Sequence, residues 1–301
     1  MPVAAEPKPL TAPLPGGQAG ATVRVRPLLS AEILAPPQFF DRPGGPLPVA
    51  MARAFMTRKS TWSPLPIPVF LVDHPGVGPI LVDCGLHASV ASDPRDNLGR
   101  VGAAMYDLRM EPGQGIPAQL EALGVDPHGI KVVVMTHLHY DHASGVGQFP
   151  EATFVVTRDE WAAATTGGAM QGYRPRQFDY AFDWRTVDFG RPEVDSFASF
   201  GRSVDLFGDG SVRLVSTPGH SAGHQSLVLR LGGGRELLLA GDAALRRRAI
   251  DEGELQLLCA DDHLYRRSLT EIRRYVEQTP DATVVCGHDP DGFRALREIY
   301  S

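Results

Sequence analysis

The segment 136–142 constrains the fold of this chain more than any other. It places three imidazoles and one carboxylate within six positions, which are His137, His139, Asp141 and His142. Ligands of this kind at this spacing are the chemistry of a metal site. The β-branched apolar run 130–135 precedes the segment and predicts a buried strand. The ligands therefore leave the end of a strand, where α/β proteins usually place their functional sites.

Three further potential ligands also follow strand-like runs. They are His220 after 211–215, Asp242 after 236–239 and His288 after 283–286. A single histidine after a strand is usually an ordinary loop residue, but all of these together favour one converging site. Five imidazoles and two carboxylates exceed what one tetrahedral zinc uses. They suit two metals that share a bridging carboxylate.

Composition indicates a soluble globular protein, since 43% of the 301 residues are apolar and 21% are charged. The net charge of −6 argues against a nucleic-acid partner. Three widely spaced cysteines without a C-x-x-C pair fit buried free thiols in a reducing compartment. We find no secretory signal and no run of the ~20 apolar residues that a membrane span needs. We therefore expect a cytoplasmic protein with no membrane partner.

The chain divides unevenly. Residues 1–20 are rich in Pro, Ala and Gly and predict a disordered leader, while 21–301 predict a single domain. Residues 167–200 form an aromatic-rich stretch broken by Gly and Pro, which predicts either a lid over a pocket or a packed surface segment. Further strands are predicted at 66–72, 79–83, 153–157 and 226–231, and helices at 116–123, 159–164 and 264–276.

With these motifs the chain resembles the metallo-β-lactamase-fold superfamily from about residue 23 onward. The resemblance implies an α/β fold, a four-layered αβ/βα sandwich with the metals between the two sheets. It implies that one metal takes His137, His139 and His220. The other would take Asp141, His142 and His288, with Asp242 bridging both. It also implies that Asp83 braces the histidine loop from behind, although a turn-forming Asp is the alternative. His224 is expected to support the ligands rather than to bind metal.

Within the superfamily the likeness is greatest to the quorum-quenching N-acyl-homoserine lactonases. It is carried by the motifs at 116–124, 137–142, 217–227 and 287–289. Those lactonases carry a tyrosine three residues after the bridging aspartate, and Leu245 occupies that position here. We expect the side chain at 245 to contact substrate, and a hydroxyl to come from Tyr140, Tyr106 or Tyr265. Segments around Phe39, Met105 and 173–189 are expected to form an apolar pocket.

The resemblance implies a hydrolase that opens a lactone or cleaves a carboxylic ester. A hydroxide bridging two divalent metals would attack the carbonyl carbon. Asp141 would pass a proton to the leaving alkoxide, and Asp242 would hold both metals. Zinc is the expected metal, with iron, cobalt and manganese as alternatives, and the expected partner is a small-molecule substrate.

Other functions stay open at this stage. An arylesterase, an organophosphate hydrolase or a glyoxalase II-like thioesterase would use the same metals, and Leu245 favours these somewhat. An iron-dependent redox enzyme of the same fold and a non-catalytic binding protein are further alternatives. The resemblance also implies a possible homodimer.

Overall fold

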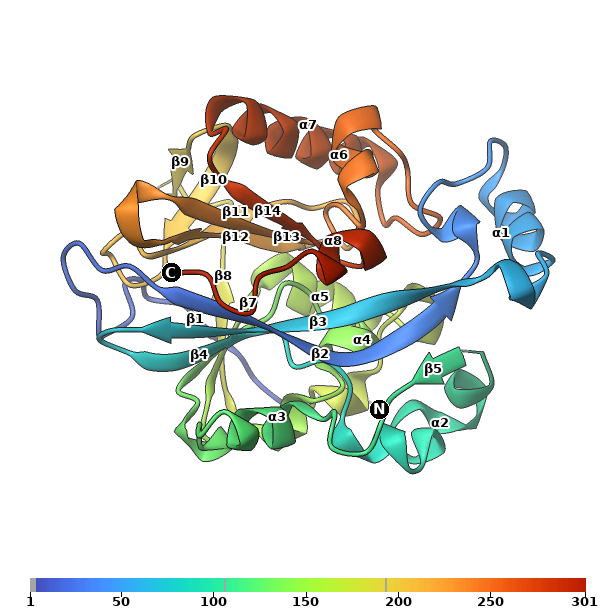
Figure 1. Ribbon diagram of the computed structural model, residues 1–301, viewed down its shortest axis with the longest axis horizontal. Coiled ribbons are helices and arrows are strands. Elements are labelled where there is room, and N and C mark those ends of the chain that lie inside the picture. Colours follow the sequence, from blue (N-terminus) through green and yellow to red (C-terminus); the bar gives the residue numbers. More distant parts are fainter. Residues whose placement is uncertain (1–3, 106, 193) are drawn as a thin grey trace.

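The protein folds as two facing β-sheets with helices on their outer sides (Figure 1). The computed structural model describes residues 4–105, 107–192 and 194–301. In Figure 1 the helices α6 and α7 lie above the second sheet, and α2 and α3 lie on the opposite side of the molecule. This arrangement of layers confirms the αβ/βα sandwich expected from the sequence.

The first sheet has eight strands. In spatial order they are β1 (Lys8–Pro9), β8 (Asp183–Val187), β7 (Thr153–Thr157), β6 (Val132–Val134), β4 (Gly78–Val82), β3 (Ser63–His74), β2 (Arg24–Ala35) and β5 (Asp107–Arg109). From β4 through β6, β7 and β8 to β1 the neighbours are parallel, while β2 pairs antiparallel with both β3 and β5. Parallel neighbours bring their carboxyl ends to one edge of the sheet, so the loops after β4, β6 and β7 lie together.

The second sheet has six strands. In spatial order they are β14 (Thr283–Cys286), β13 (Glu236–Gly241), β12 (Gln225–Arg230), β11 (Val212–Ser216), β10 (Phe200–Asp205) and β9 (Asp195–Phe197). Only β13 and β14 are parallel, and the other neighbours are antiparallel. The carboxyl ends of β13 and β14 therefore meet at the same edge.

Short helices connect and cover the strands. The α-helices are α1 (Leu47–Phe55), α2 (Pro94–Met105), α3 (Ile116–Ala122), α4 (Tyr140–Ala143), α5 (Arg158–Thr166), α6 (Arg247–Glu252), α7 (Asp262–Gln278) and α8 (Pro290–Arg294). The amphipathic α7 places buried residues such as Leu269 and Ile272 against the second sheet. Along α3, Ile116 and Leu120 are buried against the first sheet.

The core between the sheets consists of alternating apolar side chains. Val72 and Val82 from the first sheet and Leu214 and Leu229 from the second belong to this layer and are at most 1% exposed. Burial of such residues supplies the main driving force for closing the sandwich. The edge of this packed layer holds the loops that carry the candidate ligands.

The amino-terminal segment differs from the expected disordered leader. Residues 8–9 form β1, which pairs with β8, and the side chain of Leu10 is buried between the sheets. The backbone amides of Ala4 and Ala5 both donate to a carboxylate oxygen of Asp179. The prediction failed because an extended, proline-rich segment suits the edge of a sheet as well as it suits disorder.

The stretch 167–200 is also more regular than predicted. It contributes β8 and β9 to the two sheets, and Tyr173, Phe178 and Trp184 pack into the core beneath the first sheet. These three aromatic side chains are therefore part of the packed core. Their packing favours the second sequence interpretation, that of a packed segment. No helix among the described residues is long and apolar enough to span a membrane.

Candidate metal centre

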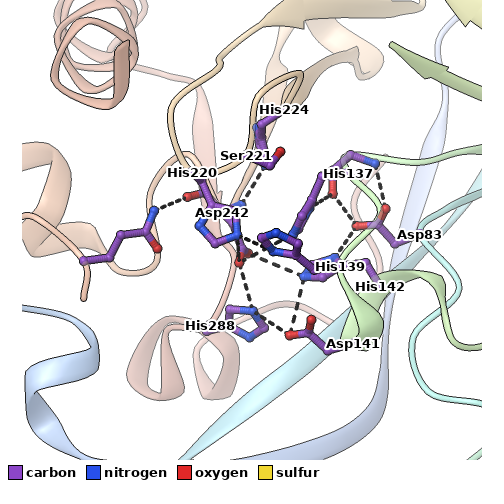
Figure 2. A network of polar contacts seen from close by, with 12 residues as sticks. Asp83, His137, His139, Asp141, His142, His220, Ser221, His224, Asp242 and His288 are labelled. Atoms are coloured by element: carbon purple, nitrogen blue, oxygen red, sulfur yellow. Dashed lines mark hydrogen bonds and ion pairs between the residues drawn. The ribbon is translucent and has the colours of Figure 1, made fainter. Parts of the chain in front are cut away.

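Four loops bring the predicted ligands to one edge of the sandwich (Figure 2). The loop after β6 runs directly into the short helix α4 and carries four of them. The loops after β11, β13 and β14 carry one each, which are His220, Asp242 and His288. All seven residues are brought together as the sequence predicted.

The first group consists of His137, His139 and His220. One ring nitrogen from each lies within 4.8 Å of the others. The Nδ1 atom of His139 is 2.9 Å from Nε2 of His220, although these side chains come from different sheets. Three imidazole nitrogens at this spacing suit one divalent cation.

The second group consists of Asp141, His142 and His288, whose ligand atoms also lie within 4.8 Å of one another. The distance from Nε2 of His288 to Oδ2 of Asp141 is 3.5 Å, and from Nε2 of His142 to the same oxygen it is 3.8 Å. Two imidazoles and a carboxylate suit a second cation.

Asp242 lies between the two groups. Its Oδ2 atom is 3.2 Å from Nε2 of His220 in the first group and 3.3 Å from Nε2 of His288 in the second. Its Oδ1 atom is 3.6 Å from Nε2 of His142. This carboxylate therefore reaches both groups, which is the position of a bridging ligand.

Unpartnered polar atoms test whether a metal fits this site. The Nε2 atoms of His137 and His142 and the Oδ1 atom of Asp242 are buried, and among the described residues they have no hydrogen-bond partner. Leaving buried polar atoms without partners is costly. Because these atoms point into the same cluster, divalent cations would satisfy them, and the donor set fits two such ions.

Asp83 organises the loop after β6 from behind, as the sequence predicted. It accepts hydrogen bonds from the backbone amide and the hydroxyl of Thr136, at 2.7 and 2.8 Å, and from Nδ1 of His142 at 2.8 Å. The backbone φ of Asp83 is +63°, a left-handed conformation that is uncommon for residues other than glycine. Three hydrogen bonds to one side chain offset this strain.

Backbone and hydroxyl groups orient other imidazoles. Nδ1 of His288 donates to the carbonyl of Pro66 at 2.7 Å, which directs Nε2 toward Asp242. Asp83 likewise binds Nδ1 of His142 and directs its Nε2 inward. Contacts of this kind fix the ring tautomer that a metal ligand requires.

His224 lies beside the cluster without facing into it. Its Nε2 accepts a hydrogen bond from the backbone amide of Asp242 at 3.0 Å, and its Nδ1 is 2.9 Å from the hydroxyl of Thr217. Burial, reinforced by nearby His220, lowers the pKa of His224 to about 3. A neutral His224 therefore holds the strand end that carries Asp242.

Electrostatics divide the cluster into two kinds of histidine. Burial lowers the pKa of His137, His139 and His220. Burial also disfavours a charge on His142, but Asp83, Asp141 and Asp242 outweigh it and raise the pKa of His142 to about 10. Asp242 similarly raises the pKa of His288 despite its burial. Protons on these two rings balance the carboxylates in the metal-free protein, and bound cations would replace them.

The predicted substrate-contact residues have different positions. Leu245 and Tyr140 are 1% and 7% exposed and pack together with Phe40 in one apolar cluster. Leu245 is therefore a buried member of this cluster, and its contact with substrate stays a prediction. Tyr265 lies on α7, and its side chain is fully buried against the second sheet. Tyr106 lies outside the described residues.

Sequence reasoning missed two buried supports of the site. Gln256 donates from Nε2 to the backbone carbonyl of Asp242 at 3.1 Å. Glu160 accepts hydrogen bonds from two of the ligand-bearing loops. The pattern Thr157-x-x-Glu160 after a strand predicts a helix capping box, but the Glu160 side chain turns inward instead.

Two facing sheets with a cluster of five histidines and two aspartates at one edge define a class of metal-binding α/β sandwich. The chain belongs to the metallo-beta-lactamase superfamily, whose family model matches residues 62–288. This match confirms the resemblance seen in the sequence.

Individual relatives agree with this assignment. The chain is 37% identical over 243 residues to N-acyl homoserine lactonase AttM of Rhizobium radiobacter, covering 79% of this chain and 88% of the relative. A solved structure of N-acyl homoserine lactone hydrolase with the product N-hexanoyl-L-homoserine at its catalytic metal centre has a TM-score of 0.72 and 21% identity. It matches 92% of this chain and 97% of its own. AidC, a dizinc quorum-quenching lactonase, has a TM-score of 0.60 and 15% identity, matching 92% of this chain and 90% of its own.

Proposed function

We propose that this protein is a two-metal hydrolase that opens the lactone ring of N-acyl homoserine lactones. The observation that carries the proposal is Asp242, whose carboxylate reaches both groups of ligand atoms. The substrate follows from the relatives, because the AttM protein that is 37% identical over most of this chain is an N-acyl homoserine lactonase.

In this proposal His137, His139 and His220 would hold one cation, and Asp141, His142 and His288 would hold the other. Asp242 would contribute to both sites. When bound, two divalent cations lower the pKa of a water molecule and polarise the substrate carbonyl. Zinc suits the histidine-rich donor set, and iron, cobalt and manganese are the alternatives.

Asp141 is the residue proposed to move a proton. Its side chain is 13% exposed, more than those of Asp242, His142 and His288. The Oδ2 atom of Asp141 is 3.5 Å from Nε2 of His288. Asp141 takes no part in the hydrogen bonds that Asp83 accepts from Thr136 and His142. Asp141 would take a proton from the attacking water and pass it to the alkoxide that forms when the C–O bond of the ring breaks. His139 is also partly exposed, so the substrate would approach past His139 and Asp141.

Leu245 favours a second candidate, an aryl ester, a phosphotriester or a thioester substrate on the same metals. Its buried aliphatic side chain offers no hydroxyl to a substrate carbonyl or leaving oxygen. A substrate with an activated leaving group needs such a donor less.

One panel assay tests both candidates. The zinc-loaded protein is offered acyl-homoserine lactones of several chain lengths, aryl esters, a paraoxon-like triester and a glutathione thioester. We expect the largest kcat/KM on a lactone. A larger value on any other class replaces the lactone proposal with the second candidate.

Ligand substitutions test the metal scheme itself. Asp242→Ala and His139→Ala are expected to lose both bound metal and turnover. His128→Ala, which removes an exposed histidine, is the matched control and should change neither. Full turnover by a metal-free Asp242→Ala protein would contradict the scheme. A cytoplasmic location and a homodimer stay predictions from the sequence.

A further inference from the structure

Glu160 is a buried carboxylate that lies outside the candidate ligand set. It stands in the first turn of α5 and is 0% exposed. Two backbone amides and two hydroxyls donate hydrogen bonds to it. Buried glutamates are uncommon unless their charge is satisfied in this way.

The Oε1 atom of Glu160 holds the loop after β6. It accepts from the backbone amide of Leu138 at 3.0 Å, and Leu138 lies between the candidate ligands His137 and His139. The same oxygen accepts from the hydroxyl of Tyr173 at 3.1 Å. The Tyr173 ring packs against the His139 ring with centroids 4.9 Å apart.

The Oε2 atom of Glu160 holds the loop after β11, which belongs to the other sheet. It accepts from the hydroxyl of Ser221 at 2.6 Å and from the backbone amide of Gly223 at 3.0 Å. Ser221 directly follows His220, the third member of the first group. One carboxylate therefore connects the backbones that carry all three histidines of that group.

The start of α5 gives this connection a rigid base. The hydroxyl of Thr157 accepts from the amide of Glu160 at 3.1 Å and is 2.6 Å from the carbonyl of Gly223, to which it donates. A Cβ atom at Gly223 would come closer than 3.0 Å to the Glu160 backbone, so only glycine allows this approach. The loop is thus clamped against a helix that itself follows β7 in the first sheet.

We infer that Glu160 is a positioning residue that sets His137, His139 and His220 at the distances one metal ion requires. The inference rests on the proposed function, because it assumes that this group binds a cation. Preorganisation of this kind strengthens metal binding without a direct contact to the metal, and its loss typically weakens binding 10- to 100-fold.

The four donors around Glu160 need a side chain that presents only acceptor oxygens. Burial raises the pKa of Glu160, and the hydrogen bonds from Ser221, Leu138, Gly223 and Tyr173 lower it in part. Four donors around two oxygens suit a carboxylate. In Glu160→Gln the side-chain NH₂ group would face two of these donors, so this nearly isosteric change breaks the clamp with little loss of volume.

The experiment measures metal affinity in the whole chain. Protein is freed of metal with a chelator, and Zn²⁺ is titrated by calorimetry and Co²⁺ by its visible absorbance. A His288→Ala background leaves the first group complete and removes one ligand of the second. Asp159→Asn is the matched control, since it removes the same charge from the same helical turn but at a side chain that is 68% exposed.

We expect Glu160→Gln to weaken metal binding in the first group about 10- to 100-fold and to change the Co²⁺ spectrum, while Asp159→Asn matches the parent protein. Wild-type affinity and spectrum in Glu160→Gln, even with a lower melting temperature, would overturn the inference. If Glu160→Gln does not fold, Tyr173→Phe and Ser221→Ala each remove one donor, and unchanged affinity in both would overturn it as well. A wild-type protein that binds metal but hydrolyses no lactone would contradict the proposed substrate. The metal-affinity test of Glu160 would still be valid.

Discussion

At the scale of single residues, three buried carboxylates divide the work of building the site. Asp242 reaches both ligand groups, while Asp83 and Glu160 hold ligand-bearing loops through hydrogen bonds. Each of the two supporting carboxylates accepts from at least one backbone amide, so each fixes chain geometry rather than a side chain alone. Removing such an acceptor leaves buried donors unsatisfied.

His224 supports a prediction about the pH dependence of stability in the metal-free protein. Its folded pKa of about 3 lies below the ordinary value of 6.5, so between these values the unfolded chain binds the extra proton. The contribution of His224 to stability is therefore lost as the pH falls from 6.5 toward 3. Between pH 6.5 and 5 the loss should reach about 2 kcal/mol.

The measurement compares urea unfolding of the metal-free wild type and His224→Gln at pH 7.5 and pH 5. Glutamine can still accept from the amide of Asp242 but does not titrate. The wild type should lose more stability over this interval than the variant does. Equal losses would show that His224 is not held neutral.

At the scale of elements, the parallel strands decide which loops meet. β4, β6 and β7 end at the edge that carries Asp83, the four ligands of 136–142 and Glu160. The parallel pair β13 and β14 brings Asp242 and His288 to the matching edge of the second sheet. The amino-terminal strand β1 completes the first sheet on its far side.

The burial of Leu10 next to β1 supports a second prediction. Leu10→Ala should lower the free energy of unfolding by about 2–3 kcal/mol, since it removes a side chain that is only 9% exposed. Lys8→Ala, at an exposed position of the same segment, should stay within about 0.5 kcal/mol of wild type. Urea unfolding at constant pH measures both. Equal stability of the two variants would mean that the segment does not pack in solution.

Several elements escaped prediction for identifiable reasons. β8 alternates Asp183 and Arg185 with the buried Trp184, Thr186 and Val187, but it lies inside a stretch broken by Gly and Pro that hides this period. β2 contains Pro27 and a mixed polar pattern over twelve residues. Strands with continuous β-branched residues, such as β6 and β14, were found because their apolar pattern is uninterrupted.

At the scale of the whole molecule, the candidate metal centre connects the two sheets. Four candidate ligands follow a strand of the first sheet, and three follow strands of the second. Cations bound by both sets would cross-link halves of the sandwich that otherwise meet mainly through apolar packing. Binding to the folded state alone stabilises it.

Metal removal should therefore lower thermal stability. At a free metal concentration about a thousand times the Kd, metal binding should raise the free energy of unfolding by about 4 kcal/mol. This corresponds to a rise in melting temperature on the order of 10 °C. Differential scanning calorimetry with added Zn²⁺ and with a chelator measures this shift. Asp242→Ala is the control and should respond little to either addition. If the chelator does not change the melting temperature of the wild type, this result would argue against a metal centre that links the two sheets.

The local order of residues was enough to predict the ligand types, the strands that precede them and the family, because those properties depend on neighbours in the chain. The roles of Glu160 and Leu245 and the docking of the amino-terminal segment depended on residues far away in the sequence. Glu160 faces Ser221 and Gly223 only because two sheets pack face to face. Such distant contacts leave no periodic signal in a single sequence, so the tertiary structure alone decided them.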